Sequence, residues 1–177
     1  MQKLSKSFYL GSIAGGLVVY ILLLIVSVAM STTGNRDAGI AFLVLGLLVA
    51  LYAVVVWLVL IYNMWAAIQD GQARTTPGKA VGFLFIPFFN IYWIFQAIHG
   101  FAKDYNSYLQ RHSINAPPLG EGLFLAICIL AMVSIVPFLG ILASLVNLDL
   151  IIIVAGKICD AVNALPASPA AAPAMGR

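Results

Sequence analysis

The sequence predicts an all-α integral membrane protein, and three observations carry this prediction. Of the 177 residues, 63% are hydrophobic and only 8% are charged, whereas about a quarter of the residues in soluble domains are charged. The apolar runs are long and lack the alternation typical of barrel strands, so helices are expected to satisfy the backbone in lipid. About four apolar segments are present, and the third and fourth are interrupted at Pro87 and Pro137, which predicts kinked or re-entrant helices.

The first two apolar runs are long enough to cross a membrane. They extend from about Phe8 to Met30 and from about Ala38 to Ile68, and roughly 20 apolar residues suffice for a crossing. The first run is longer than the roughly 7–15 apolar residues of a signal peptide, so we expect it to be retained as a helix. Tyr62 and Trp65, near the end of the second run, are predicted to anchor that helix at the membrane surface.

The third segment begins as an apolar helix and ends as an amphipathic one. Pro87 interrupts the hydrogen bonding of a helix, and Asn90 is a preferred N-cap for a new helix that we expect from about Ile91 to Arg111. Polar side chains recur every three or four positions in this second helix, as is typical of an amphipathic helix. They are Gln96, His99, Lys103, Asn106 and Gln110.

The fourth apolar run, from Gly122 to about Ala155, does not fit a simple span. Its roughly 34 residues would make a helix of about 50 Å, which is too long for one crossing and too short for two. Pro137 and Gly140 interrupt this run, much as Pro87 interrupts the third segment. We therefore expect helix breaks at all three positions.

Both interrupted segments end in similar polar residues, which suggests an internal repeat. Lys103, Asp104 and Asn106 in the third segment loosely match a set after the fourth, namely Lys157, Asp160 and Asn163. We expect a single helical membrane domain over residues 1–165. The Ala/Pro-rich tail, residues 166–177, is predicted to be disordered.

The positions of the basic residues predict the topology, because Lys and Arg concentrate in cytoplasmic loops. If all four segments cross, six of the nine basic residues are cytoplasmic, and Arg36, Lys103 and Arg111 are outside. If the third and fourth segments re-enter, eight are cytoplasmic and only Arg36 is outside. The charges therefore favour re-entrant segments, the segment lengths favour kinked spans, and both arrangements place the N-terminus in the cytoplasm.

A few polar residues inside the apolar segments form a candidate polar membrane site. Asp149 is the most unusual, because a charged side chain within a membrane is costly and often functional; the alternative is that it lies near the membrane surface. His99 either lines an aqueous cleft or faces the headgroups from an interfacial helix. The candidate residues are Asn90, Gln96, His99, Asn147 and Asp149.

The chain lacks the patterns of the common catalytic and metal sites. His99 and His112 are the only histidines, and neither has a partner at metal-ligand spacing. No nucleophile motif or nucleotide-binding loop is present, and no Lys/Arg-rich block suggests nucleic acid. Cys128 and Cys159 are expected to be small buried side chains. We therefore expect no enzyme, no catalytic residue, no metal and no cofactor.

The segment Pro77–Phe95, PGKAVGFLFIPFFNIYWIF, and the residues around it resemble a family of small bacterial multi-span membrane proteins. The family is classed among the domains of unknown function, and one of its apolar segments carries a FIPFFN-x-YW-like signature. The resemblance covers roughly residues 63–163. It implies a multi-pass protein of the bacterial cytoplasmic (inner) membrane, and it implies no catalytic residue.

These observations predict a non-enzymatic accessory or scaffold component of a membrane assembly. Its expected partners are membrane lipids and either other membrane subunits or further copies of itself. The alternative is a small oligomeric transporter or channel, because paired interrupted segments are the usual sequence sign of a transport site. The two hypotheses differ in whether Asn90, His99 and Asp149 converge on a cavity within the membrane.

Overall fold

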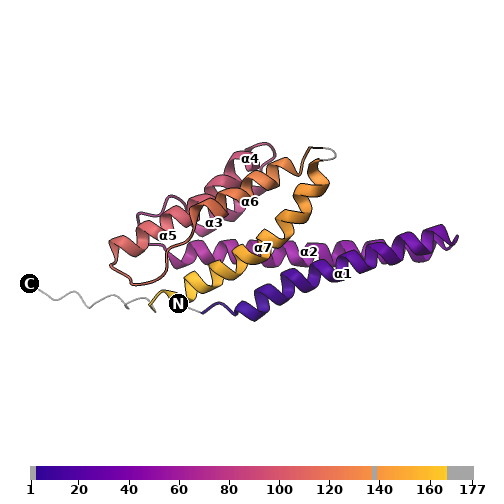
Figure 1. Ribbon diagram of the computed structural model, residues 1–177, viewed down its shortest axis with the longest axis horizontal. Helices are drawn as coiled ribbons and strands as arrows, with labels where there is room; N and C mark the ends of the chain where they lie inside the picture. The colour runs from indigo at the N-terminus through magenta and orange to yellow at the C-terminus, as the bar shows by residue number, and fades with distance from the viewer. Residues whose placement is uncertain (1–2, 137–138, 167–177) are drawn as a thin grey trace, which may run out of the picture. The chain divides into compact units, whose positions relative to one another are not determined.

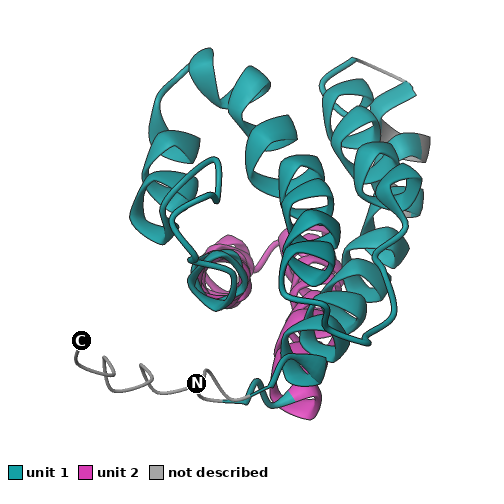
Figure 2. Ribbon diagram, turned by 90° about the vertical axis from the view of Figure 1, so that its left-hand side faces the viewer, with its two compact units in different colours: residues 1–5, 61–177 teal, residues 6–60 magenta. Residues whose placement is uncertain are grey.

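A computed structural model of the chain describes residues 3–136 and 139–166, and all secondary structure in these ranges is helical (Figure 1). The prediction of an all-α fold is therefore confirmed for the described residues. The chain divides into two compact units (Figure 2): unit 2 is Lys6–Leu60, and unit 1 comprises Met1–Ser5 and Ile61–Arg177. Residues 167–177 of the predicted tail, 166–177, and the predicted break at Pro137 lie outside the described residues.

Unit 2 is a pair of antiparallel helices. Helix α1, Lys6–Thr32, is followed after a short turn by α2, Arg36–Ala67, whose last residues belong to unit 1. The Ser12 hydroxyl shares a 3.0 Å hydrogen bond with the Tyr52 hydroxyl, and the Ser27 hydroxyl donates to the carbonyl of Gly39 at 2.7 Å. The helices approach closely at Gly39, where an added Cβ would overlap the Ser31 hydroxyl.

By length and composition, α1 and α2 are the two described helices that could cross a membrane. Only 11% and 22% of the residues in their most apolar windows are buried. The core helix of a soluble protein would be mostly buried. Large apolar side chains such as Val18, Leu22, Ile25, Leu48 and Leu51 are exposed, so unit 2 presents apolar surface along both helices.

The broken third segment forms a helical hairpin, hairpin A. Its first arm consists of α3 and a 3₁₀ turn, η1. Its return arm is a continuous helix made of α4, a π-helical turn, η2, and α5. The elements are α3 Pro77–Gly82, η1 Phe83–Phe85, α4 Phe89–Ile94, η2 Phe95–His99 and α5 Gly100–Arg111. Trp93 Nε1 on the return arm donates to the carbonyl of Ala80 on the first arm at 3.1 Å, which ties the two arms together.

The tip of hairpin A turns at Pro87 and Phe88. Phe88 has φ 64°, the Phe89 N–H donates to the Pro87 carbonyl at 2.7 Å, and the Asn90 N–H donates to the Ile86 carbonyl at 3.0 Å. A bulky residue at positive φ is strained, at a cost of about 1–3 kcal/mol. The expected break at Pro87 is present, but the prediction that Asn90 caps the new helix is wrong. Because the reversal at Phe88 starts the helix at Phe89, Asn90 lies exposed in its first turn.

The fourth segment forms a second hairpin, hairpin B. Helix α6, Glu121–Val133, packs against α7, Leu139–Ala164, and a turn that begins at Ser134 separates them. Gly140 lies in the first turn of α7, with its N–H 2.7 Å from the Val136 carbonyl. An added Cβ there would lie 2.5 Å from the Ser134 carbonyl oxygen. Gly140 therefore allows the close approach that the turn requires.

The two hairpins of unit 1 lie side by side, with their tips at the same end. The Cys128 thiol on α6 lies 3.6 Å from the Ile94 carbonyl, whereas Glu121, at the start of α6, lies 3.3 Å from the Asn106 amide. Helix α6 is thus antiparallel to the return arm of hairpin A. We call the end where the hairpins turn the tip end, and the end where α5 and α7 finish the base.

Trp65 in the last turns of α2 is the largest fully buried side chain. Its Nε1 donates to the Ala97 carbonyl at 2.9 Å, and its ring meets Phe101 edge-on, with centroids 5.6 Å apart. The predicted membrane-surface anchor at Trp65 is therefore wrong, because the helix turns this side chain toward α5. Tyr62, one turn earlier, is 48% exposed.

Candidate functional site

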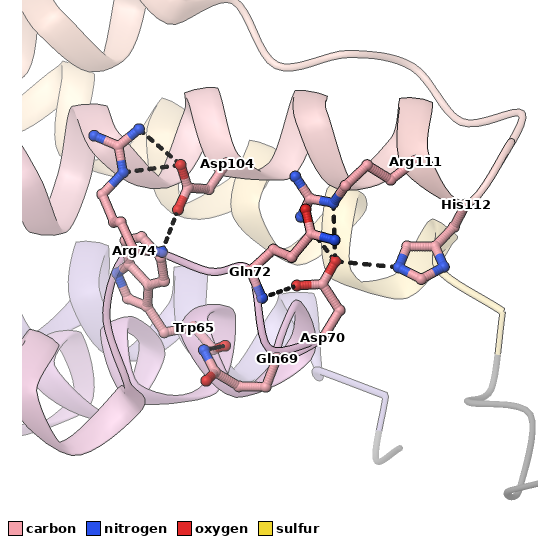
Figure 3. Close-up of polar contacts among 8 residues, drawn as sticks. All are labelled: Trp65, Gln69, Asp70, Gln72, Arg74, Asp104, Arg111 and His112. Carbon is pink, nitrogen blue, oxygen red and sulfur yellow. Dashed lines mark hydrogen bonds and ion pairs between the residues drawn. The ribbon is translucent and has the colours of Figure 1, made fainter.

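The loop between α2 and α3, residues 68–76, holds a cluster of polar contacts at the base of unit 1 (Figure 3). The Asp70 carboxylate accepts hydrogen bonds from Arg111 Nε at 3.0 Å and from Arg111 Nη2 at 2.8 Å. His112 Nε2 lies 3.2 Å from the same oxygen, and the Gln72 N–H donates to the other oxygen at 2.9 Å. A single carboxylate thus joins the loop to the end of α5.

A second ion pair joins the same loop to α5 two helical turns earlier. Asp104 accepts from the Arg74 backbone N–H and from Arg74 Nε, both at 2.8 Å, and lies 2.7 Å from Nη2. Arg74 Nη1 also donates to Gln96 at 3.3 Å. The guanidinium lies over Gly100, where an added Cβ would be 3.0 Å from Nη1. We call Asp70, Arg74, Asp104, Arg111 and His112 the basal cluster.

The side-chain amide of Gln69 connects the end of α2 to the far end of the loop. Its Nε2 donates to the carbonyl of Trp65 at 2.9 Å and to that of Thr75 at 3.1 Å. The side chains of Asp70 and Asp104 are only 10% and 13% exposed, whereas Arg74 and Arg111 are about a third exposed. The carboxylates are therefore enclosed by their cationic partners, and the cluster faces water through its cations.

The pKa of Asp70 is lowered from 3.8 to about 2. Burial raises it, but the hydrogen bonds from Gln72, Arg111 and His112 together outweigh burial. Because the folded pKa lies below the unfolded one, these contacts stabilise the protein above about pH 4, and that stabilisation is lost as the pH falls toward about 2.

We expect replacement of Asp70 by Asn to remove about 1–2 kcal/mol of stability at pH 7, after allowance for solvent screening. The measurement is unfolding in a mild detergent at several pH values between neutral and strongly acidic. The difference between wild type and Asp70→Asn should shrink as the pH approaches the folded pKa. A difference that stays constant with pH would contradict the assignment of this titration to Asp70.

Two asparagines make the same pair of hydrogen bonds in different hairpins. Asn106 Nδ2 donates to the Leu119 carbonyl at 2.9 Å, and its Oδ1 accepts from the Leu119 N–H at 2.8 Å. Asn163 does the same to Leu4, at 2.8 Å and 2.7 Å. Each clamped leucine lies two residues before a helix, α6 or α1. This shared geometry supports the match between Asn106 and Asn163 in the proposed repeat.

The structure does not bring the predicted polar residues to one place. Gln96 accepts a hydrogen bond from Arg74 of the basal cluster. His99 is half-buried and lies about one helical turn after Gln96. Asn90 is exposed at the tip, about 13 Å along the helix from His99. Asp149 is exposed on α7. Within the described ranges, no hydrogen bond or ion pair connects these last three residues.

Asn147 differs from the other predicted residues, because part of it is buried without a partner. Its Oδ1 is enclosed and has no hydrogen-bond partner among the described residues. A buried carbonyl oxygen without a donor is unfavourable. This atom is the one polar group of the predicted set whose environment calls for a further ligand or neighbour.

The sequence patterns do not identify the basal cluster as a unit. Asp104 and Arg111 are two helical turns apart and so share a face of α5. On the preceding loop the acidic residue, Asp70, pairs with Arg111, and the basic residue, Arg74, pairs with Asp104. In a chain with so few charges, two Asp–Arg sets on consecutive segments were a usable signal. What the cluster does chemically is to fix the loop to α5, because its charges pair with one another.

No group of three or more His, Cys, Asp or Glu residues in the described part of the chain is arranged to hold a metal ion. Both cysteines, Cys128 and Cys159, are buried. Comparisons with family models, with curated proteins and with solved structures find no match to the chain.

Proposed function

We propose that this chain is a non-enzymatic integral membrane protein, an accessory or scaffold component of a bacterial inner-membrane assembly. In this arrangement α1 and α2 cross the membrane, hairpins A and B re-enter it, and the N-terminus and the base are cytoplasmic. The proposal rests on the membrane-compatible length of α1 and α2 and on their exposed apolar surface.

The polarity of unit 1 is the observation that carries the proposal. Its ion pairs lie at the base, between the loop 68–76 and α5, whereas no Lys, Arg, Asp, Glu or His occurs between residues 80 and 98. Lys103 and Arg111 lie in α5, on the base side of the hairpin. With re-entrant hairpins they join the cytoplasmic side, which satisfies the preference for basic cytoplasmic loops.

A scaffold role fits how the polar groups are used. The carboxylates of the basal cluster are enclosed by arginines, and Asn106 and Asn163 bind backbone groups. These side chains hold segments of the chain together, which is the use of polar groups that a scaffold needs. The exposed apolar faces of α1 and α2 then remain for lipid or for partner helices.

Cysteine accessibility tests the topology. Ser107, exposed on α5, and Asp37, exposed at the start of α2, are replaced singly by Cys and treated with a membrane-impermeant maleimide in oriented vesicles. We expect Ser107→Cys to react only from the cytoplasmic side and Asp37→Cys only from the other side. Wild type is the blank, because Cys128 and Cys159 are buried.

Two results would contradict the proposal at different levels. Reaction of both variants from the same side would exclude the re-entrant arrangement. Release of the protein by an alkaline wash would exclude an integral membrane protein altogether. A gentle-detergent pull-down then tests the scaffold role, which requires a stoichiometric partner or a second copy of the chain.

The second candidate function is a small oligomeric transporter or channel. The enclosed Oδ1 of Asn147, which has no hydrogen-bond partner among the described residues, favours it, because polar side chains within membrane helices often mark ion pathways. An ion flux into proteoliposomes that Asn147→Leu abolishes would support this function. Unchanged flux in that variant would exclude Asn147 from any pathway.

A further inference from the structure

We propose that hairpins A and B enter only one leaflet of the bilayer, so that unit 1 acts as a wedge that favours membranes convex on the base side. This inference rests on the proposed membrane location, and it adds an activity, the shaping or sensing of curvature.

The first arms of both hairpins are too short to cross a membrane. Helix α3 has 6 residues and η1 has 3, which together make about 15 Å. Helix α6 has 13 residues, or about 20 Å. A hydrocarbon core measures about 30 Å, so one leaflet contributes about 15 Å. Arms of this length reach the bilayer centre from the base side and do not reach the far surface.

The return arms carry their first charged or histidine side chain at the same depth. His99 and Asp149 each lie ten residues beyond the first residue of their return arm, Phe89 and Leu139. Ten residues of helix correspond to about 15 Å. Tips at the bilayer centre therefore place both residues at the boundary with the headgroups. This placement explains how an exposed carboxylate at Asp149 is compatible with a membrane-embedded helix.

Exposed apolar residues lie at the tip of hairpin A and in the described part of the turn of hairpin B. Phe88 is 87% exposed and Phe85 is 68% exposed at the tip of hairpin A, and Ile135 is 67% exposed in the turn after α6. Phe88 in addition holds a positive φ, and its exposed ring packs little against the rest of the chain. Acyl chains are the occupant that fits, because the tips are uncharged while the opposite end carries the ion pairs.

Helices confined to one leaflet expand that leaflet alone. Each arm has a diameter of about 10–12 Å, so four arms add roughly 300–450 Å² of cross-section. A spanning helix such as α1 or α2 adds equal area to both leaflets and creates no imbalance. The leaflet on the base side therefore expands, and we expect a dependence on curvature like that of amphipathic helices that insert into one leaflet.

The depth of the tips is tested first. Phe88→Cys and Ile135→Cys carry a nitroxide label in vesicles of phosphatidylcholine and phosphatidylglycerol, and Ser107→Cys, exposed on α5, is the control. We expect both tip labels to show high accessibility to oxygen and low accessibility to an aqueous nickel chelate, and the control to show the reverse. A tip label that the chelate reaches would overturn insertion to the bilayer centre.

Curvature preference is tested by orientation, because randomly inserted wedges would cancel. The fraction of molecules with the base outward is read from maleimide labelling of Ser107→Cys, in small sonicated and in large extruded vesicles. We expect the ratio of outward to inward molecules to be about twofold higher in the small vesicles. Equal ratios in both vesicle sizes would overturn the wedge.

A matched pair of variants, each made in the Ser107→Cys chain, links this preference to the tip. Phe88→Asp places a charge at the tip, whereas Gln110→Asp places the same charge on the exposed base end of α5. We expect Phe88→Asp to lose the small-vesicle enrichment and Gln110→Asp to keep it, while both melt like wild type in detergent. If neither variant changes the enrichment, the tips do not cause it. Extraction by an alkaline wash would instead contradict the proposed membrane location, so the two failures are distinguishable.

Discussion

Trp65→Ala is expected to destabilise unit 1 by about 3–5 kcal/mol, the range for removal of a fully buried large aromatic side chain. The side chain has no exposed surface, packs on Phe101 and donates to the Ala97 carbonyl. Its loss leaves a cavity where α2 meets the return arm of hairpin A. Thermal or denaturant unfolding in a mild detergent measures the effect.

Tyr62→Ala is the control on the same helix, because Tyr62 is about half exposed. We expect it to cost less than about 1 kcal/mol in detergent. Trp65→Phe separates packing from hydrogen bonding and should cost about 1–2 kcal/mol, mainly for the lost bond to Ala97. Equal and small losses for Trp65→Ala and Tyr62→Ala would restore the interpretation of Trp65 as a membrane-surface anchor.

Removal of both asparagine clamps is expected to have an effect of similar size. Asn106→Ala and Asn163→Ala each delete two hydrogen bonds to a leucine backbone, at about 1–3 kcal/mol apiece. The two sites lie in different hairpins and share no partner, so the double variant should lose about the sum. The measurement is the free energy of unfolding of the single and double variants in detergent.

Two further variants sharpen this prediction. Asn90→Ala, at an exposed position of the tip, should stay within about 0.5 kcal/mol of wild type. Asn106→Asp should cost more than Asn163→Asp, because Glu121 lies beside Asn106 and would repel the new carboxylate. Very different losses for the two Asn→Ala variants would argue against equivalent roles in the two halves.

The long apolar helices were the part of the fold that the sequence could predict. The expected runs Phe8–Met30 and Ala38–Ile68 correspond to α1, Lys6–Thr32, and α2, Arg36–Ala67. An uninterrupted apolar run has few alternatives to a helix, so its existence and approximate ends follow from composition. The break near Pro87 was predictable for the same kind of local reason, because proline lacks the N–H that a helix needs.

The features that depend on distant partners were not predictable. Whether a tryptophan at a helix end faces lipid or a neighbouring helix depends on what packs there, and for Trp65 the partner is Ala97. The start of α4 depends on a positive φ at Phe88, which no residue preference indicates. The pairing of Asp70 with Arg111 joins residues 41 positions apart. Sequence patterns indicate the faces and ends of helices. They do not indicate which other segment packs against each face.

The clamp between Leu4 and Asn163 has a consequence for how the molecule is made. Its two partners are 159 positions apart in the chain, so Leu4 is synthesised long before Asn163. The segment before α1 therefore lacks its two hydrogen bonds to Asn163 until α7 has been synthesised. Completion of α7 thus fastens the segment before α1 to α7, and truncation of α7 before Asn163 would leave that segment without its two hydrogen bonds.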